Sequence, residues 1–270
     1  MRIEANDTTV LVLAGHSHIN CFGVPNSHDS TTELKQVPSF DNVYGICAPW
    51  PRETDFSSKV ASLVQGKTLA YLYSGWNQLL FASPEMFDFV SAEFPDLPLD
   101  PNAVVVPEDL VLLHEAVRHF PFALRAGFEV LREYGVSNIS ILCPPPPKED
   151  NSKLKSRLPW EGVLVERAVQ LGLDPKTASF LPPTIRLKLW GLIARIYRQE
   201  AERIGATFIG VPPASQDKFG YLKEEYWGAD VTHANERYGI MYCQHILDSL
   251  SFGEVATCWA PCGPTPLNRK

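Results

Sequence analysis

Five short apolar runs, rich in β-branched residues, constrain the fold of this 270-residue chain more than any other feature. The runs are continuous, whereas a strand with one solvent-facing side alternates apolar and polar residues. Continuous runs therefore predict strands that are covered on both faces, as in a parallel sheet. The predicted strands cover residues 9–14, 42–46, 68–73, 138–143 and 207–211.

Segments with the helical spacing of apolar residues alternate with these strands. They cover residues 84–93, 108–134, 184–204 and, at the end, 235–250. Gly135 and Gly205 each follow a helical segment shortly before a strand, where the left-handed C-cap conformation favours glycine. Alternation of this kind predicts an α/β protein, with an open, doubly wound sheet between two layers of helices.

The length of the chain, with 45% hydrophobic and 20% charged residues, predicts one globular domain with a full core. We expect this domain at residues 1–252, followed by a Pro- and Gly-rich tail at 253–270. Residues 144–183 follow the fourth predicted strand, begin with four prolines and include a further predicted helix at 161–171. Because ligands bind at the carboxyl ends of parallel strands, an insertion there is a predicted lid.

The charge balance is acidic, with a formal net charge of −7 and an isoelectric point near 5.5. Binding to a phosphate backbone depends on clustered Lys and Arg, so we expect no nucleic-acid partner. No apolar run approaches the roughly 20 residues that a membrane-spanning helix needs. The residues before the first strand are too polar and too short for a signal peptide, and we expect a cytoplasmic protein without a membrane span.

The six cysteines show neither the density nor the spacing of a disulfide scaffold, which predicts mostly free thiols. Cys258 and Cys262 could close a small loop or supply half of a metal site. No second Cys or His pair at zinc spacing accompanies them, which favours two thiols in a tail and leaves their pairing open.

Ser17 lies two residues beyond Gly15, at the end of the first predicted strand. A serine at a strand-to-helix turn exposes its Oγ to the cleft of an open sheet, and its backbone N–H lies near a helix start, where anions bind. The sequence therefore predicts a nucleophile. A serine in this position can instead simply cap the next helix.

Ser17 needs a base, because a free hydroxyl is a poor nucleophile at neutral pH. His233 is the best of the seven histidines, since Asp230 lies three residues earlier and can reach Nδ1 from the same loop. This would leave Nε2 to face the serine. The alternative interpretation is a helix N-terminus in which Asp230 or Thr232 is the cap, and the two can both hold.

Asn77 follows the third predicted strand in the segment Gly75-Trp76-Asn77. An Asn side chain at such an edge can donate Nδ2–H to an oxyanion. It can also be a turn residue that bonds its own backbone.

Together these segments resemble the blocks of the SGNH (GDSL-type) hydrolase family, in order and in position along the chain. Gly15-His16-Ser17 resembles Gly-Asp-Ser of block one, and Gly45 resembles the block-two glycine. Gly75-Trp76-Asn77 resembles Gly-x-Asn of block three, and the segment 230–233 resembles Asp-x-x-His of block five. The resemblance implies a five-stranded, flavodoxin-like parallel sheet in an α/β/α sandwich.

By this resemblance the chain is expected to be a serine esterase that acts on an acyl group of a carbohydrate or small metabolite. Ser17 would be the nucleophile, His233 the base and Asp230 its partner, without a metal or organic cofactor. The oxyanion hole would comprise the Ser17 and Gly45 amides and the Asn77 side chain. His16, His18 and Trp76 are candidate substrate-binding residues.

The chain departs from the family at His16, which replaces the block-one aspartate. This substitution keeps two alternatives open, an O-acyltransferase of the same fold and a non-catalytic ligand-binding protein. His16 and His18 could also be read as two metal ligands, although no third ligand accompanies them.

Overall fold

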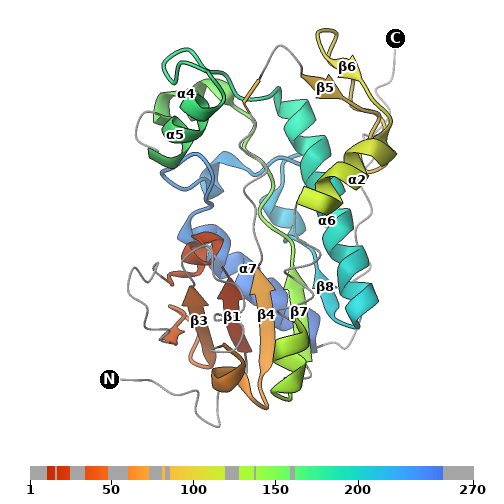
Figure 1. Ribbon diagram of the computed structural model, residues 1–270. Helices are drawn as coiled ribbons and strands as arrows, with labels where there is room; N and C mark the ends of the chain where they lie inside the picture. Colours follow the sequence, from red (N-terminus) through yellow and green to blue (C-terminus); the bar gives the residue numbers. More distant parts are fainter. Residues whose placement is uncertain are drawn as a thin grey trace, which may run out of the picture.

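A central parallel sheet organises the structure, a computed structural model that describes residues 11–15, 17–24, 34–47, 60–72, 81–82, 86–118, 128–136, 138–158 and 162–251. Its strand order is β2-β3-β1-β4-β7-β8 (Figure 1). The parallel strands are β1 (Leu11–Gly15), β3 (Val43–Cys47), β4 (Thr68–Leu72), β7 (Asn138–Leu142) and β8 (Thr207–Ile209). The two-residue β2 (Lys35–Gln36) lies antiparallel at the edge next to β3.

The five predicted strands are confirmed, each within about two residues of its predicted bounds. Numbered in chain order among themselves, they lie in the sheet as 2-1-3-4-5, which is the flavodoxin-like order. The edge strand β2 was not predicted, because two residues are too few to show a pattern. The chain crosses from one side of β1 to the other between β3 and β4, so a ligand-binding crevice is expected at the carboxyl end of β1.

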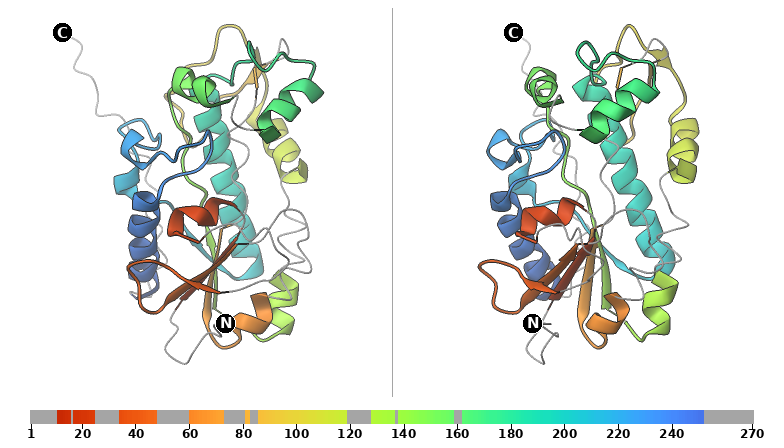
Figure 2. Two further views of the ribbon diagram at one scale, coloured as in Figure 1. Left: turned by 90° about the vertical axis from the view of Figure 1, so that its left-hand side faces the viewer. Right: turned by 60° about the vertical axis from the view of Figure 1, so that its left-hand side comes forward.

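Helices cover both faces of the sheet (Figure 2). On one face, α6 (Pro183–Ile204) packs with the helical segments 60–64 and 128–133. On the other face lie α7 (Glu236–Ser251) and the 3₁₀ helix η1 (Ser17–Phe22). The predicted helices at 184–204 and 235–250 are confirmed. Gly135 and Gly205 have φ values of 77° and 67°, as expected for left-handed C-caps.

The segment 86–118 differs from the prediction in its first part and contains a predicted helix in its second part. The helix predicted at 84–93 is wrong for the described residues 86–93, which contain strand β5 (Phe87–Asp88) instead. β5 pairs in parallel with β6 (Val104–Val105) in a small second sheet. The helix predicted at 108–134 begins as α2 (Glu108–Arg118), and the segment 128–133 is also helical.

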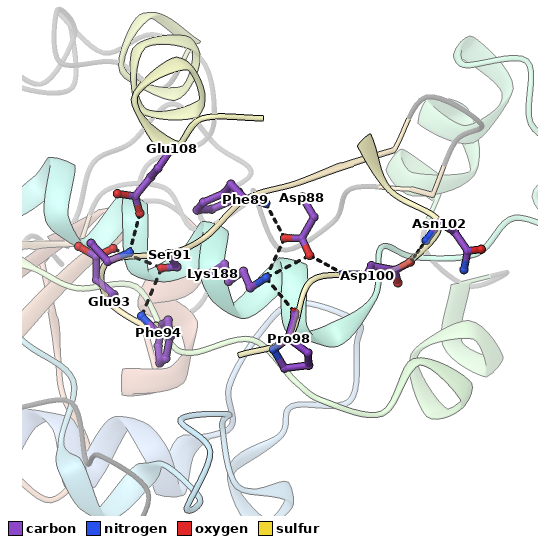
Figure 3. Close-up of polar contacts among 11 residues, drawn as sticks. Asp88, Phe89, Ser91, Glu93, Phe94, Pro98, Asp100, Asn102, Glu108 and Lys188 are labelled. Carbon is purple, nitrogen blue, oxygen red and sulfur yellow. Dashed lines mark hydrogen bonds and ion pairs between the residues drawn. The ribbon is translucent and has the colours of Figure 1, made fainter. Parts of the chain in front are cut away.

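A buried ion pair fastens this second sheet to α6 (Figure 3). Lys188 Nζ lies 2.9 and 3.0 Å from the two carboxylate oxygens of Asp88 and donates to Pro98 O at 3.0 Å. Asp88 also accepts the backbone N–H groups of Phe89 and Asp100. Both charged side chains are fully buried. The Asp88 carboxylate therefore makes contacts that a helix at 84–93 would not make. This explains why the helical spacing of apolar residues gives the wrong prediction here.

Removing the charge of Lys188 should destabilise the protein, because Asp88 would remain buried without its cation. For Lys188→Met we expect the free energy of unfolding to fall by about 3–5 kcal/mol. Urea denaturation measures it. The matched control is Arg237→Met, at an exposed ion pair with Glu225, where a loss of at most about 1 kcal/mol is expected. Equal losses in the two variants would mean that the buried pair matters no more to stability than the exposed one.

The insertion at 144–183 lies beyond the carboxyl edge of the sheet, toward which the arrowheads point in Figure 1. It contains α4 (Asn151–Arg157) and α5 (Gly162–Gln170), the latter close to the predicted helix at 161–171. Leu154 and Leu164 from these helices share a small core with Val231, from the loop that also carries Asp230 and His233. The insertion thus packs against the predicted catalytic segment. Whether it acts as a lid stays a prediction.

Four cysteines among the described residues are buried and form no disulfide, in agreement with the prediction of mostly reduced thiols. They are Cys21, Cys47, Cys143 and Cys243. Cys258 and Cys262 lie outside the described residues. Within the part of the chain that the structure describes, no helix combines the length and apolarity that crossing a bilayer would require.

Candidate active site

The turn after β1 places Ser17 at the carboxyl edge of the sheet. Gly15 is the last residue of β1 and pairs in register with Leu72, the last residue of β4. A Cβ at Gly15 would overlap the carbonyl oxygen of Leu72, so only glycine fits this approach. Ser17 begins η1 two residues later and is half-buried. Its chain position at the strand end is therefore the one predicted.

The packing of α7 on η1 brings the two ends of the domain together. Gly239 of α7 lies directly against the backbone of Cys21 and Phe22, and a Cβ there would overlap the Cys21 carbonyl oxygen. The two helices thus touch backbone to backbone. This close contact fixes the distance between the helix that begins with Ser17 and the helix that follows His233.

A tight loop at residues 227–235 precedes α7. Trp227 and Ala234 form an isolated antiparallel bridge, and Gly228 N donates to His233 O at 2.8 Å. Asn235 closes the loop, since its Nδ2 donates to the carbonyl oxygens of Glu225 and Trp227. Its Oδ1 accepts the backbone N–H of Tyr238, so Asn235 caps α7. The alternative that Asp230 or Thr232 caps this helix is therefore excluded by the observed bonds.

Asp230 is directed instead at His233. Its Oδ2 lies 2.5 Å from His233 Nδ1, and its Oδ1 accepts the backbone N–H groups of Thr232 and His233 at 2.8 and 2.6 Å. Burial alone would raise the pKa of the Asp230 carboxyl. Hydrogen bonds from the ring and backbone of His233, together with the nearby charges of His233 and Lys148, hold the pKa well below its ordinary value. Asp230 is therefore an ionised acceptor for the imidazole.

The opposite ring nitrogen, His233 Nε2, is buried and has no hydrogen-bond partner among the described residues. The ring of His233 packs on the ring of His18, with centroids 4.8 Å apart. His18 is the residue after Ser17 in η1. The structure thus brings η1 and the loop at 227–235 side by side, with Nε2 left unused by the hydrogen bonds that orient the ring.

Gly45 lies within β3, whereas the resemblance to the block-two glycine implies a position after a strand. It lies in the middle of β3, with Leu13 and Lys35 as register partners on its two sides. A backbone N–H at such a position lies in the plane of the sheet and points toward a neighbouring strand rather than into the crevice. A Cβ at Gly45 would overlap the side chain of Val24, which explains the glycine by packing. This corrects the expectation that Gly45 supplies an oxyanion-hole amide.

Three predicted site residues, His16, Trp76 and Asn77, lie outside the described residues. β4 ends at Leu72, which precedes both residues in the chain and is the register partner of Gly15. Within the described residues, no group of three or more His, Cys, Asp or Glu side chains is arranged to hold a metal ion.

Two basic residues near the loop were not singled out from the sequence. Lys148 Nζ donates to Asp230 O at 2.7 Å, and Arg157 Nη1 donates to Gly228 O at 2.8 Å. Both come from the insertion, about 70 to 80 residues before the loop in the chain. No local pattern links a lysine after a proline run to a carbonyl so far along the chain, so the sequence carries no signal for this contact.

Comparison with known proteins gives structural relatives only. No family model and no curated protein matches the chain. One similar solved structure is a variant of an acetyl-xylooligosaccharide esterase from Geobacillus stearothermophilus, with 10% identity, a TM-score of 0.46 and coverage of 93% of this chain and 97% of that chain. Another is a GDSL-like lipase from Bacteroides thetaiotaomicron, with 10% identity, a TM-score of 0.43 and coverage of 92% and 90%.

Gly239→Ala tests the contact between η1 and α7. Within a helix this change ordinarily stabilises by about 0.5–1 kcal/mol. Here the new Cβ meets the Cys21 carbonyl oxygen, and we expect a net loss of about 1–3 kcal/mol, the cost of overpacking. Thermal or urea unfolding gives the sign. Gly162→Ala at the start of α5, where a Cβ meets nothing within 4 Å, is the control and should be neutral or stabilising.

The pairing of Asp230 with His233 predicts a stability contribution that depends on pH. The folded-state pKa of Asp230 lies below its unfolded value, so the contribution is fully present above the unfolded pKa of about 4. It is lost as the pH falls from there through the folded-state pKa. The difference in unfolding free energy between the wild type and Asp230→Asn should therefore shrink between about pH 4 and pH 2. A constant difference across that range would show that the pairing does not shift this pKa.

Proposed function

We propose that this protein is a serine hydrolase that cleaves an ester through an acyl-enzyme on Ser17. The observation that carries the proposal is an imidazole held at Nδ1 by an ionised carboxylate, with its Nε2 free of described partners, against the helix that begins with Ser17. A base oriented by an acid and placed beside a hydroxyl is the arrangement that nucleophilic acyl transfer requires.

In the proposed reaction Ser17 Oγ attacks the ester carbonyl carbon while His233 Nε2 accepts the hydroxyl proton. The tetrahedral intermediate collapses as its C–O bond to the alcohol breaks, and His233 returns the proton to the leaving alcohol. Water then attacks the acyl-enzyme with His233 again as base, which releases the acid and restores Ser17. Asp230 holds the productive tautomer and stabilises the imidazolium at each stage.

The oxyanion must be bound by groups near Ser17. The Ser17 amide, at the first residue of η1, and the Asn77 side chain remain the proposed donors, whereas Gly45 is left out because of its place within β3. Each well-placed donor contributes about 3–4 kcal/mol of barrier lowering in known hydrolases. The proposed substrate is a small acyl ester of a carbohydrate or metabolite. His16, His18 and Trp76 are the proposed contacts, and no cofactor is required by the chemistry.

Turnover of p-nitrophenyl acetate tests the two central roles. We expect Ser17→Ala and His233→Ala each to lower kcat by at least about 10³-fold, because the pair acts as one unit. Far-ultraviolet circular dichroism and the unfolding midpoint should stay close to those of the wild type. The control is His245→Ala, a histidine of α7 away from the loop, which should retain activity. Full activity in His233→Ala would mean that another group is the base.

The same assay separates the hydrolase from an acyltransferase of the same fold. A hydrolase should show steady release of acetate with water as the only acceptor. A transferase should show a burst of p-nitrophenol equal to the enzyme concentration, and steady release only after an alcohol or sugar is added. Neither burst nor turnover in the wild type would favour a non-catalytic binding protein.

A further inference from the structure

The four prolines at 144–147 form a buried strut between the end of β7 and the insertion. All four are buried although they lie outside helix and sheet. Proline has no N–H, so such a run leaves no unsatisfied backbone donor in the interior. At least two of the four carbonyls accept hydrogen bonds, since Pro144 O accepts Trp190 Nε1 at 2.9 Å and Pro147 O accepts the backbone N–H of Leu222 at 3.0 Å. The strut therefore holds the next residue, Lys148, in a fixed place.

Lys148 is buried, with 1% of its surface exposed, and its ammonium group reaches the loop that carries Asp230. Nζ donates to Asp230 O at 2.7 Å and lies 3.5 Å from Gly228 O. Arg157, at the end of α4, binds the same two carbonyls, at 3.1 Å to Asp230 O and 2.8 Å to Gly228 O. Two cations from the insertion thus converge on two carbonyl oxygens of one turn, on the backbone side of Asp230.

Because Lys148 and Arg157 bind backbone carbonyls, the Asp230 carboxylate is left to bind His233. A cation bound to the Asp230 carboxylate would compete with the imidazole for its oxygens, since charge-assisted bonds are the strong ones. Here both carboxylate oxygens accept hydrogen bonds from Thr232 and His233. The two cations bind the backbone carbonyls of the loop instead. The charge of Lys148 nevertheless lowers the pKa of Asp230, and so helps to keep it ionised.

We propose that Lys148 and Arg157 are positioning residues for Asp230, the carboxylate that orients His233. They fix the backbone of Asp230 so that its carboxylate holds His233 Nδ1, and they couple the insertion to the site. This inference rests on the proposed function for its effect on catalysis. Its structural part, the effect on the bond between Asp230 and His233, does not.

The first measurement is the proton resonance of His233 Nδ1–H, identified by its loss in Asp230→Asn. Lys148→Met, which keeps most of the aliphatic stem, and Arg157→Met should each shift this resonance or speed its exchange with water. Arg157→Lys keeps a charged donor and should restore part of the wild-type behaviour. Lys155→Met is the matched control, because Lys155 lies on α4 and donates to the carbonyl of Thr177 within the insertion. In Lys155→Met the His233 Nδ1–H resonance should be unchanged.

The second measurement is kinetic. Lys148→Met should lower kcat by about 10- to 100-fold, the cost of a small misplacement of a catalytic group, and leave KM within about twofold. In the Asp230→Asn background the same substitution should have no further effect on kcat, because it acts through the carboxylate.

An unchanged resonance in both Lys148→Met and Arg157→Met overturns the proposal, and so does a loss of kcat that is the same in the two backgrounds. If the wild type shows no esterase turnover, the proposed function fails, whereas the resonance still decides whether these cations position Asp230. Arg157 is only partly buried, so its variants keep the test open should Lys148→Met fail to fold.

Discussion

The backbone contact between η1 and α7 is the constraint on which the candidate site depends. The nucleophile candidate follows the first described strand, and the imidazole candidate precedes α7, the last described helix, more than 200 residues later. A parallel sheet brings both segments to one edge, but only a glycine at position 239 lets the two helices approach until their backbones touch. The contact between the tilted rings of His18 and His233, with centroids 4.8 Å apart, follows from this approach. The sheet topology places η1 and the loop with His233 at the same edge of the sheet, and the contact at Gly239 sets the distance between η1 and α7.

The loop with Asp230 is held in place before any substrate binds. It is closed by the bridge between Trp227 and Ala234, fastened by Asn235 and bound from the insertion by Lys148 and Arg157. Catalysis by oriented dipoles and charges gains when the orientation is already fixed, because no reorganisation accompanies the reaction. The insertion is therefore more than a predicted cover over the crevice. Through the prolines at 144–147, Lys148 and Arg157, the insertion also holds the loop that carries Asp230.

The sheet could be predicted from the sequence because strands covered on both faces leave a continuous apolar signal that does not depend on distant residues. The helix prediction failed at the described residues 86–93, where Asp88 binds Lys188, a partner 100 positions away that no local spacing can show. Short motifs singled out Asp230 and His233, which the structure pairs, and Ser17, whose role stays a proposal. They did not show that Gly45 lies within β3, because a glycine near a strand end looks the same whether it frees an amide or makes room for Val24. Lys148 and Arg157 had no signal at all, since their acceptors are backbone carbonyls.

The most direct test of the proposed pairing of Ser17 with His233 is the site of covalent modification by a fluorophosphonate, which reacts with a serine only when a base activates it. After incubation, the modified peptide is identified by mass spectrometry in the wild type and in His233→Ala. We expect one adduct, on Ser17, that is lost or formed far more slowly in the variant. An adduct on another residue, or labelling of Ser17 at the same rate without His233, would contradict the central claim that these two side chains act together.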